Sequence, residues 1–279
     1  MKILEVYIKN FRGIKELKAQ TNSNLVIIEG DRGEGKTSFI SAIKWCLCVA
    51  PRNINFVCFQ NDKERKVLLK IEKDSEIFDL EICDNNGKRE HYITINNTKI
   101  RVNYREYIDF VKNKLIKNPC FDMNFIDSLY YGYNKHIGLT LSDAKKEKIN
   151  DIADKLGFPI PERKLVFDNN LDCQIYVENR KLSGGFYSSG DNVLRMTIGK
   201  MIAVKFLEEI IAEKRKQEIS LPIFLDDVFL MISEEYVMHV CKYLQKFNNQ
   251  LFITNIPSNK LFFDNEKISV VDLKKSKIS

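Results

Sequence analysis

The stretch from residue 25 to residue 48 constrains the fold more than any other part of the sequence. Leu25 to Ile28 is a continuous apolar run, typical of a buried strand, and Thr37 to Cys48 carries apolar residues at helical spacing. The loop between them, residues 30–37, reads GDRGEGKT and matches the phosphate-loop pattern G-x-x-x-x-G-K-[ST]. We therefore predict a nucleotide site here. The less favoured alternative is a glycine-rich turn with a solvated lysine.

The residue types of this loop suit the binding of a polyphosphate. Glycines let backbone N–H groups turn inward, and the N-terminus of the following helix adds partial positive charge. We expect Lys36 to contact the β- and γ-phosphates and the Thr37 hydroxyl to bind Mg²⁺. The nucleotide-binding residues predicted in the loop are Gly30, Asp31, Arg32, Gly33, Glu34, Gly35, Lys36, Thr37 and Ser38.

A second chemical signal is an apolar run that ends in two carboxylates. Residues 222–227 read PIFLDD, the form that a Walker B strand takes. A parallel strand would deliver its end to the same sheet edge as the phosphate loop, so Asp226 is predicted to bind Mg²⁺, directly or through water. Asp227 is predicted to be the general base, which makes Asp227 and Lys36 the expected catalytic residues. A surface turn after a core strand is the alternative for both aspartates.

Two serine- and glycine-rich stretches are candidates for a second loop that contacts phosphate. One is residues 182–185 (LSGG), and the other is residues 188–191 (SSGD), which lead directly into a long apolar helical pattern. Only a loop at a helix start can point free N–H groups at an anion, and Ser188 and Asp191 have the spacing of a capping box. We therefore favour Ser188, Ser189 and Gly190 as phosphate contacts. A Gly/Ser linker is the alternative for both stretches.

Strand-like and helical patterns alternate along the rest of the chain. Strands are expected at residues 3–8, 14–17, 221–225, 250–254 and 268–273, with several more within 66–102. Helices are expected at residues 104–116, 143–156, 191–216 and 233–247, whereas residues 159–190 are weakly patterned and rich in turn formers. This alternation predicts an α/β fold with a mostly parallel core sheet, helices on both faces and an N-terminal antiparallel β lobe.

The composition narrows the class of protein. The formal charge of +6 permits contact with nucleic acid but is too small to demand it. No run approaches the roughly 20 apolar residues that span a bilayer, so we expect a cytoplasmic protein. The 7 cysteines form no Cys-x-x-Cys pair and only 3 histidines are present, so we expect reduced thiols and no zinc site.

From end to end, the chain resembles the RecF, SbcC and SMC group of ABC ATPases. Residues 8–13 (IKNFRG) are similar to the first hairpin of that group, residues 39–45 (FISAIKW) to the helix after its phosphate loop, and residues 225–229 (LDDVF) to its Walker B strand. Residues 188–198 are similar to its signature helix, and residues 250–255 (QLFITN) to the strand before its switch position. The place of Arg12 in the first motif implies that it approaches the nucleotide, with a hairpin-capping arginine as the alternative.

The resemblance implies one ABC-type ATPase head, residues 1–279, with a core of residues 1–55 and 180–279 and an inserted lobe at about 56–179. Such a head binds ATP and Mg²⁺ and forms a homodimer around two ATP molecules, each held between the phosphate loop of one subunit and the signature loop of the other. Heads of this group act on DNA or control a nuclease partner, in repair or in defence against phage.

Four departures from the pattern of this group bear on the expected activity. Asp227 stands where many relatives carry glutamate, and Asn255 stands where histidine is common. No Q-loop glutamine is evident near residues 125–127, and the stretch from there to Ser188 is too short for an extended coiled-coil hairpin. Slow hydrolysis and no long-distance tethering of DNA are therefore expected.

Two functions remain open from the sequence. The first is an ATP-switched dimer that engages DNA or a DNA-processing partner. The second is a regulatory ATPase that controls a toxin or nuclease effector without touching DNA. A small-molecule kinase is disfavoured by the late Asp-Asp strand, and a membrane transporter subunit by the N-terminal hairpin and the missing LSGGQ sequence. Salt-sensitive DNA binding that depends on ATP would separate the first two.

Overall fold

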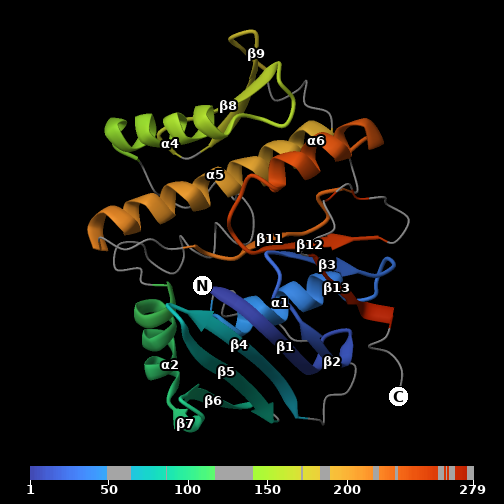
Figure 1. The fold of residues 1–279 in the computed structure, drawn as a ribbon, viewed down its shortest axis with the longest axis vertical. Helices are drawn as coiled ribbons and strands as arrows, with labels where there is room; N and C mark the ends of the chain where they lie inside the picture. Colours follow the sequence, from blue (N-terminus) through green and yellow to red (C-terminus); the bar gives the residue numbers. More distant parts are fainter. Residues whose placement is uncertain are drawn as a thin grey trace.

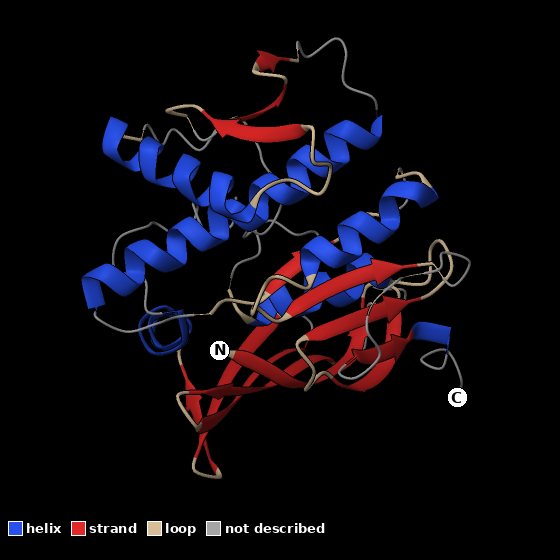
Figure 2. Ribbon diagram, turned by 45° about the horizontal axis from the view of Figure 1, so that its top comes forward, coloured by secondary structure: helices blue, strands red, loops and turns tan. Residues whose placement is uncertain are grey.

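The computed structural model describes residues 1–48, 64–85, 87–116, 141–170, 172–182, 189–215, 220–229, 232–256, 261, 263 and 268–274 (Figure 1). The strands among them form three sheets. Two of these sheets position the candidate site, and helix α1 (Lys36–Cys46) lies between them, in contact with strands of both (Figures 1 and 2).

The largest sheet is antiparallel, with the strand order β2-β1-β4-β5-β6-β7. Its strands are β1 (Lys2–Phe11), β2 (Ile14–Gln20), β4 (Arg65–Lys73), β5 (Glu76–Asn85), β6 (Lys88–Ile95) and β7 (Thr98–Val102). Along β4, Val67, Leu69 and Ile71 are buried whereas Lys70 and Glu72 are exposed, because alternate side chains point to opposite faces. One face of the sheet therefore packs on α1 and the other meets solvent, as antiparallel sheets permit.

The N-terminal hairpin is not a separate unit at the edge of the fold. Strand β1 pairs with β2 on one side and with β4 on the other. Strands β4 to β7, which the sequence placed in an inserted lobe at about residues 56–179, thus extend the sheet of the hairpin. The run of strands predicted within residues 66–102 is present, with turns at Asn96 and Asn97, both of which have positive φ.

The second sheet is parallel and carries the phosphate loop. Its strands are β3 (Leu25–Glu29), β11 (Ile223–Leu225), β12 (Leu251–Asn255) and β13 (Ile268–Asp272), in the order β11-β12-β3-β13. The predicted mostly parallel core is not confirmed, because antiparallel pairs predominate among the described strands and the parallel pairs are confined to this sheet. The alternating pattern of residues 65–102 favours hairpins with one solvated face, which explains the difference.

The remaining long helices lie on the side of the parallel sheet opposite α1. They are α5 (Ser189–Arg215), which contacts β11, α6 (Glu234–Leu244), and α4 (Asp143–Leu156), which packs against α5 (Figure 1). Helix α4 ends at Gly157, whose φ of +70° suits a residue without a side chain. These helices agree with those predicted from the sequence.

The helix predicted at residues 104–116 changes character midway. Helix α2 (Tyr104–Phe110) continues as the π-helix η1 (Val111–Ile116). Asn103 and Glu106 form a capping box at its start, and the Tyr107 hydroxyl donates to the carbonyl of Cys46 at 2.8 Å. This buried bond fastens α2 to the end of α1.

The third sheet lies within residues 159–190, where the sequence pattern predicted no strands. It is antiparallel and consists of β8 (Arg163–Phe167), β9 (Cys173–Val177) and the two-residue strand β10 (Arg180–Lys181). Its strands are only two to five residues long, so their alternation is too brief to stand out. The sheet packs on α4 and α5, which join it to the rest of the molecule.

Gln250 fastens the parallel sheet to the N-terminal strand. Its side-chain oxygen accepts from the backbone N–H of Ile3 at 2.7 Å, and its nitrogen donates to the carbonyls of Ile3 at 2.8 Å and Ser23 at 3.2 Å. Gln250 is buried, so losing this side chain would leave several backbone groups without their partners.

Burial governs the chemistry of the described cysteines. Cys46, Cys83, Cys173 and Cys241 are buried free thiols, and Cys48 is partly buried. Burial raises the pKa of the Cys83 thiol to about 12 and raises that of Cys46 even further. Within the described part of the chain, no helix is both long enough and apolar enough to cross a membrane.

Gly199 is the point of closest approach between α5 and β9, and its substitution gives a testable prediction. A Cβ at this position would lie 2.6 Å from Cys173 Sγ. We expect Gly199→Ala to lower the free energy of unfolding by about 1–2 kcal/mol, because overpacking costs about 1–3 kcal/mol and the gain in helix propensity returns only about 1 kcal/mol. Urea unfolding followed by circular dichroism measures this change.

The matched control for Gly199→Ala is the same substitution in a Cys173→Ala background. With the sulfur removed, the added methyl group has room, and Gly199→Ala is expected to be neutral or slightly stabilising. Equal destabilisation in both backgrounds would show that the sulfur contact is not the cause.

Candidate phosphate-binding site

The loop between β3 and α1 turns sharply at positions that only glycine occupies without strain. Gly33 and Gly35 have φ values of +82° and +102°. A Cβ at Gly30 would lie 3.1 Å from the Glu34 carboxylate, and one at Gly35 would lie 3.3 Å from Ile14 of β2. The N-terminal hairpin therefore supports the loop from outside, and the backbone is free to curl around its centre.

Lys36 fills the centre of this loop. Its ammonium group donates to the carbonyl of Gly30 at 2.8 Å and to that of Asp31 at 3.0 Å, and the residue is only 8% exposed. The Glu34 carboxylate accepts from the backbone N–H of Asp31 at 2.7 Å. The carbonyls of Gly30 and Asp31 thus hold a positive charge inside the loop, where it can attract a phosphate.

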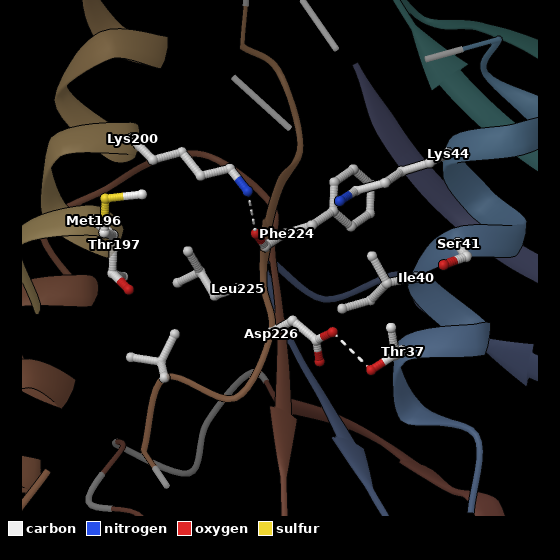
Figure 3. A pocket seen from close by; sticks show the side chains of 11 residues that line it. Thr37, Ile40, Ser41, Lys44, Met196, Thr197, Lys200, Phe224, Leu225 and Asp226 are labelled. Carbon is white, nitrogen blue, oxygen red and sulfur yellow. Dashed lines mark hydrogen bonds between the residues drawn. The ribbon is translucent and has the colours of Figure 1, made fainter. Parts of the chain in front are cut away.

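The side chain of Thr37 meets the acidic strand end. Its hydroxyl donates to Asp226 Oδ2 at 2.8 Å (Figure 3). The Thr254 hydroxyl donates to Asp226 Oδ1 at 2.9 Å. The three residues come from the start of α1 and the ends of β11 and β12. Because these strands are parallel and in register, their C-terminal ends meet at one edge of the sheet, beside the phosphate loop.

The separation of these oxygens suits Mg²⁺. Adjacent ligands of an octahedral Mg²⁺ ion at 2.0–2.1 Å lie about 3 Å apart, and Thr37 Oγ1 and Asp226 Oδ2 lie 2.8 Å apart. Mg²⁺ is usually held by one or two carboxylates together with substrate phosphates and water, rather than by a cage of side chains. In keeping with this, no group of three or more His, Cys, Asp or Glu suited to a metal ion is found among the described residues.

Asp227 is held in an unusual backbone conformation. Its φ is +57°, and its backbone N–H donates to the Thr254 hydroxyl at 2.8 Å. Desolvation by the surrounding protein raises the pKa of the Asp227 carboxyl, and the neighbouring charge of Asp226 raises it further, against the opposing charges of Lys36 and Arg32. A raised pKa makes the carboxylate a stronger base.

The other predicted site residues lie in different places. Arg12, with a φ of +49°, stands in the turn between β1 and β2 and donates to the Ser41 hydroxyl of α1 at 3.0 Å. Helix α5 begins at Ser189, two residues before the predicted start at residue 191, so Ser189 and Gly190 lie in its first turn. Asp191 forms an ion pair with Arg163 of β8. Ser188, Ser183, Gly184, Gly185 and residues 125–127 lie outside the described residues.

Thr254 is the site residue that the sequence reading missed. It is buried and touches both aspartates, and it precedes Asn255, whose carbonyl accepts from the backbone N–H of Gly30 at 3.3 Å. Its position in the sequence could have indicated its role. A polar residue at the end of an apolar strand in a parallel sheet reaches the same edge as the phosphate loop.

Comparison with known proteins agrees with this geometry. A family model described as an AAA domain matches residues 5–278, and the chain therefore belongs to that family. No curated protein sequence gives a significant match.

Solved structures similar to the chain include SMC head domains and the recombination mediator RecF. They include the SMC head domain from Thermotoga maritima, with 17% identity over 91% of this chain and 89% of that one and a TM-score of 0.52. An SMC head bound to the C-winged helix domain of ScpA has 14% identity, coverage of 92% and 90%, and a TM-score of 0.60. The recombination mediator RecF with ATPrS has 15% identity, coverage of 96% and 97%, and a TM-score of 0.54. The chain thus has the fold of an SMC- or RecF-like P-loop ATPase head, as its sequence resemblance implied.

Proposed function

We propose that the chain binds ATP with Mg²⁺, hydrolyses it, and forms an ATP-dependent homodimer that acts on DNA or on a DNA-processing protein. The observation that carries the proposal is the 2.8 Å contact between Thr37 and Asp226, beside a buried Lys36. This contact supports the proposal because a hydroxyl, a carboxylate and an ammonium group are the groups that bind a nucleotide phosphate and its cation. Thr37 and Asp226 are far apart in the sequence, and the fold brings them into contact.

The proposed roles follow from the contacts. Lys36 and the loop N–H groups bind the phosphates, while Thr37 and Asp226 hold the cation. Bound Mg²⁺ neutralises charge on the phosphate oxygens. Asp227 accepts a proton from the attacking water, and Thr254 keeps both aspartates in position through its hydroxyl.

The proposed dimer places the N-terminus of α5 from one copy against the nucleotide of the other. Ser188, Ser189 and Gly190 would supply hydroxyl and N–H donors there, and the helix N-terminus adds partial positive charge. The RecF structures solved with ATP and ATPrS support a nucleotide at this site. The SMC head solved with ScpA supports a protein partner, which we propose is a nuclease or effector.

Light scattering with and without ATP and Mg²⁺ tests the proposal, in the native chain and in Asp227→Asn. We expect a monomer without nucleotide and a dimer with it, and the dimer should persist longer in the variant because hydrolysis is slowed. Nucleotide binding without any dimer in either chain would contradict the proposed two-subunit site.

A DNA duplex added in a parallel run distinguishes the two functions left open by the sequence. Retention of DNA that requires ATP and weakens as salt rises supports direct action on DNA. A dimer that does not bind DNA under any of these conditions supports control of a protein effector instead.

The pH dependence of the proposed hydrolysis follows from Asp227. The base works only when it is deprotonated, so kcat/KM should fall as pH drops through its pKa. Because that pKa is raised, the acid limb should lie above the ordinary aspartate value of about 3.9. The Arg32 charge lowers this pKa, so Arg32→Met should move the limb to higher pH. A limb that moves to lower pH in Arg32→Met would contradict the assignment.

A further inference from the structure

A pocket of about 330 Å³ opens from the proposed cation site into the space between α1, α5 and β11 (Figure 3). Thr37 and Asp226 belong to its lining, so the pocket is continuous with the place where the proposed cation binds. Apolar side chains of Ile40, Met196 and Leu225 form another part of its wall. Charges inside such a wall act more strongly than they would in water.

Four buried polar side chains line the pocket from two facing helices. Ser41 and Lys44 come from α1 and are 5% and 6% exposed, while Thr197 and Lys200 come from α5 and are both 8% exposed. A folded chain rarely buries two ammonium groups around one cavity, because each loses its hydration. Their presence indicates that the pocket receives a group of opposite charge.

The two lysines converge on the same residue. Lys200 Nζ donates to the carbonyl of Phe224 at 2.8 Å, and Lys44 Nζ lies 5.6 Å from the centre of the Phe224 ring (Figure 3). Burial lowers the pKa of Lys200, and the charge of Lys44 lowers it further, against the opposing charge of Asp226. An anion in the pocket would relieve this repulsion between the two lysines.

The hydroxyl groups complete the donor set. The Ser41 hydroxyl accepts from Arg12, which leaves its own proton available for donation into the pocket. The Thr197 hydroxyl is a second neutral donor. Asp226 is the one carboxylate among the described residues of the lining, and it already accepts from Thr37 and Thr254. Two ammonium groups and two hydroxyls suit a tetrahedral oxyanion better than a planar or apolar ligand.

We propose that this pocket, the two-lysine pocket, is a second anion site that holds inorganic phosphate next to the nucleotide. The proposal rests on the proposed function, because hydrolysis of ATP at the neighbouring loop supplies the phosphate. The pocket shares Thr37 and Asp226 with the proposed cation site, so phosphate freed there adjoins the ammonium groups of Lys44 and Lys200.

Titration of inorganic phosphate into the chain saturated with ADP and Mg²⁺ tests the proposal by calorimetry. ADP leaves the γ-phosphate position of the loop open, so the two-lysine pocket is identified by comparing phosphate binding in the native chain and in variants of the pocket. Lys200→Met should weaken this binding by about 10- to 100-fold, and Thr197→Val by about 3- to 10-fold, with ADP affinity unchanged. Lys145→Met, an exposed lysine on α4, is the matched control and should bind phosphate normally. Thermal melts establish that each variant is folded.

A second titration separates this proposal from the proposed function. The Lys36→Met variant without nucleotide lacks the loop site but keeps the pocket, so it should still bind one phosphate. The double variant Lys36→Met, Lys200→Met should bind none. Failure of the native chain to bind ADP would contradict the proposed nucleotide site but not the two-lysine pocket. Two results would overturn the two-lysine pocket. One is that Lys36→Met binds no phosphate, and the other is that Lys200→Met and Thr197→Val bind phosphate as tightly as the native chain does.

Discussion

Replacement of Asp227 by asparagine is expected to lower the rate of ATP hydrolysis by about 10²- to 10⁴-fold, the usual contribution of a general base. ATP affinity should change little, because the proposed binding groups are Lys36, Thr37 and Asp226. Asparagine also tolerates the left-handed conformation that Asp227 adopts, at a φ of +57°, so the strand end should keep its shape. Single-turnover hydrolysis and equilibrium ATP binding measure the two quantities separately.

Asp226→Asn provides the contrast for this experiment. Asp226 accepts hydrogen bonds from Thr37 and Thr254, and the proposed Mg²⁺ site includes its carboxylate. Its replacement should weaken Mg²⁺-dependent ATP binding as well as hydrolysis. If Asp227→Asn weakens binding as much as Asp226→Asn does, or hydrolyses ATP at the native rate, Asp227 is not the base.

Lys36→Met is expected to weaken ATP binding by about 2–4 kcal/mol, which corresponds to about 30- to 1,000-fold. The methionine keeps most of the buried volume but removes the ammonium group that donates to the carbonyls of Gly30 and Asp31. Both the attraction for phosphate and part of the loop's internal bonding are lost. Fluorescence titration with a labelled ATP analogue gives the affinity.

Lys274→Met is the matched control for Lys36→Met. Lys274 forms an ion pair with Asp31 of the same loop at 3.0 Å, but its side chain is 53% exposed, and surface ion pairs contribute about 1 kcal/mol or less. ATP affinity should therefore fall by less than about 5-fold. Equal losses in the two variants would mean that general charge near the loop, and not the buried ammonium, attracts the nucleotide.

The phosphate loop and the acidic strand end were predictable because each is a short contiguous pattern whose chemistry is local. Gly33, Gly35 and Lys36 must lie together for the loop to form, and an apolar strand necessarily presents Asp226 at its end. Thr254 and Lys200 belong to other elements, and only the packing of those elements brings them to the site. A single sequence does not encode that packing in any local pattern.

The fold likewise has elements that a local sequence pattern predicts and others that depend on contacts between distant segments. Helices α4 and α6 carry apolar residues at regular spacing and were located within a few residues of their ends. Strands β8 to β10 were not predicted because each is too short to show a clear alternation. The pairing of β1 with β4, which joins the hairpin to the strands after α1, depends on contact between two separate segments and could not be read from either one.

The position of β3 in its sheet has a consequence for the order in which the protein is made. The strand that leads into the phosphate loop is flanked by β12 and β13, which come from the other end of the sequence. On the ribosome, β1 and β2 can pair as soon as they emerge, whereas β3 must wait until β12 and β13 have been made. A chain interrupted before β12 would carry the complete GDRGEGKT sequence without the sheet that shapes it. Nucleotide binding would then require that synthesis has passed β12 and β13.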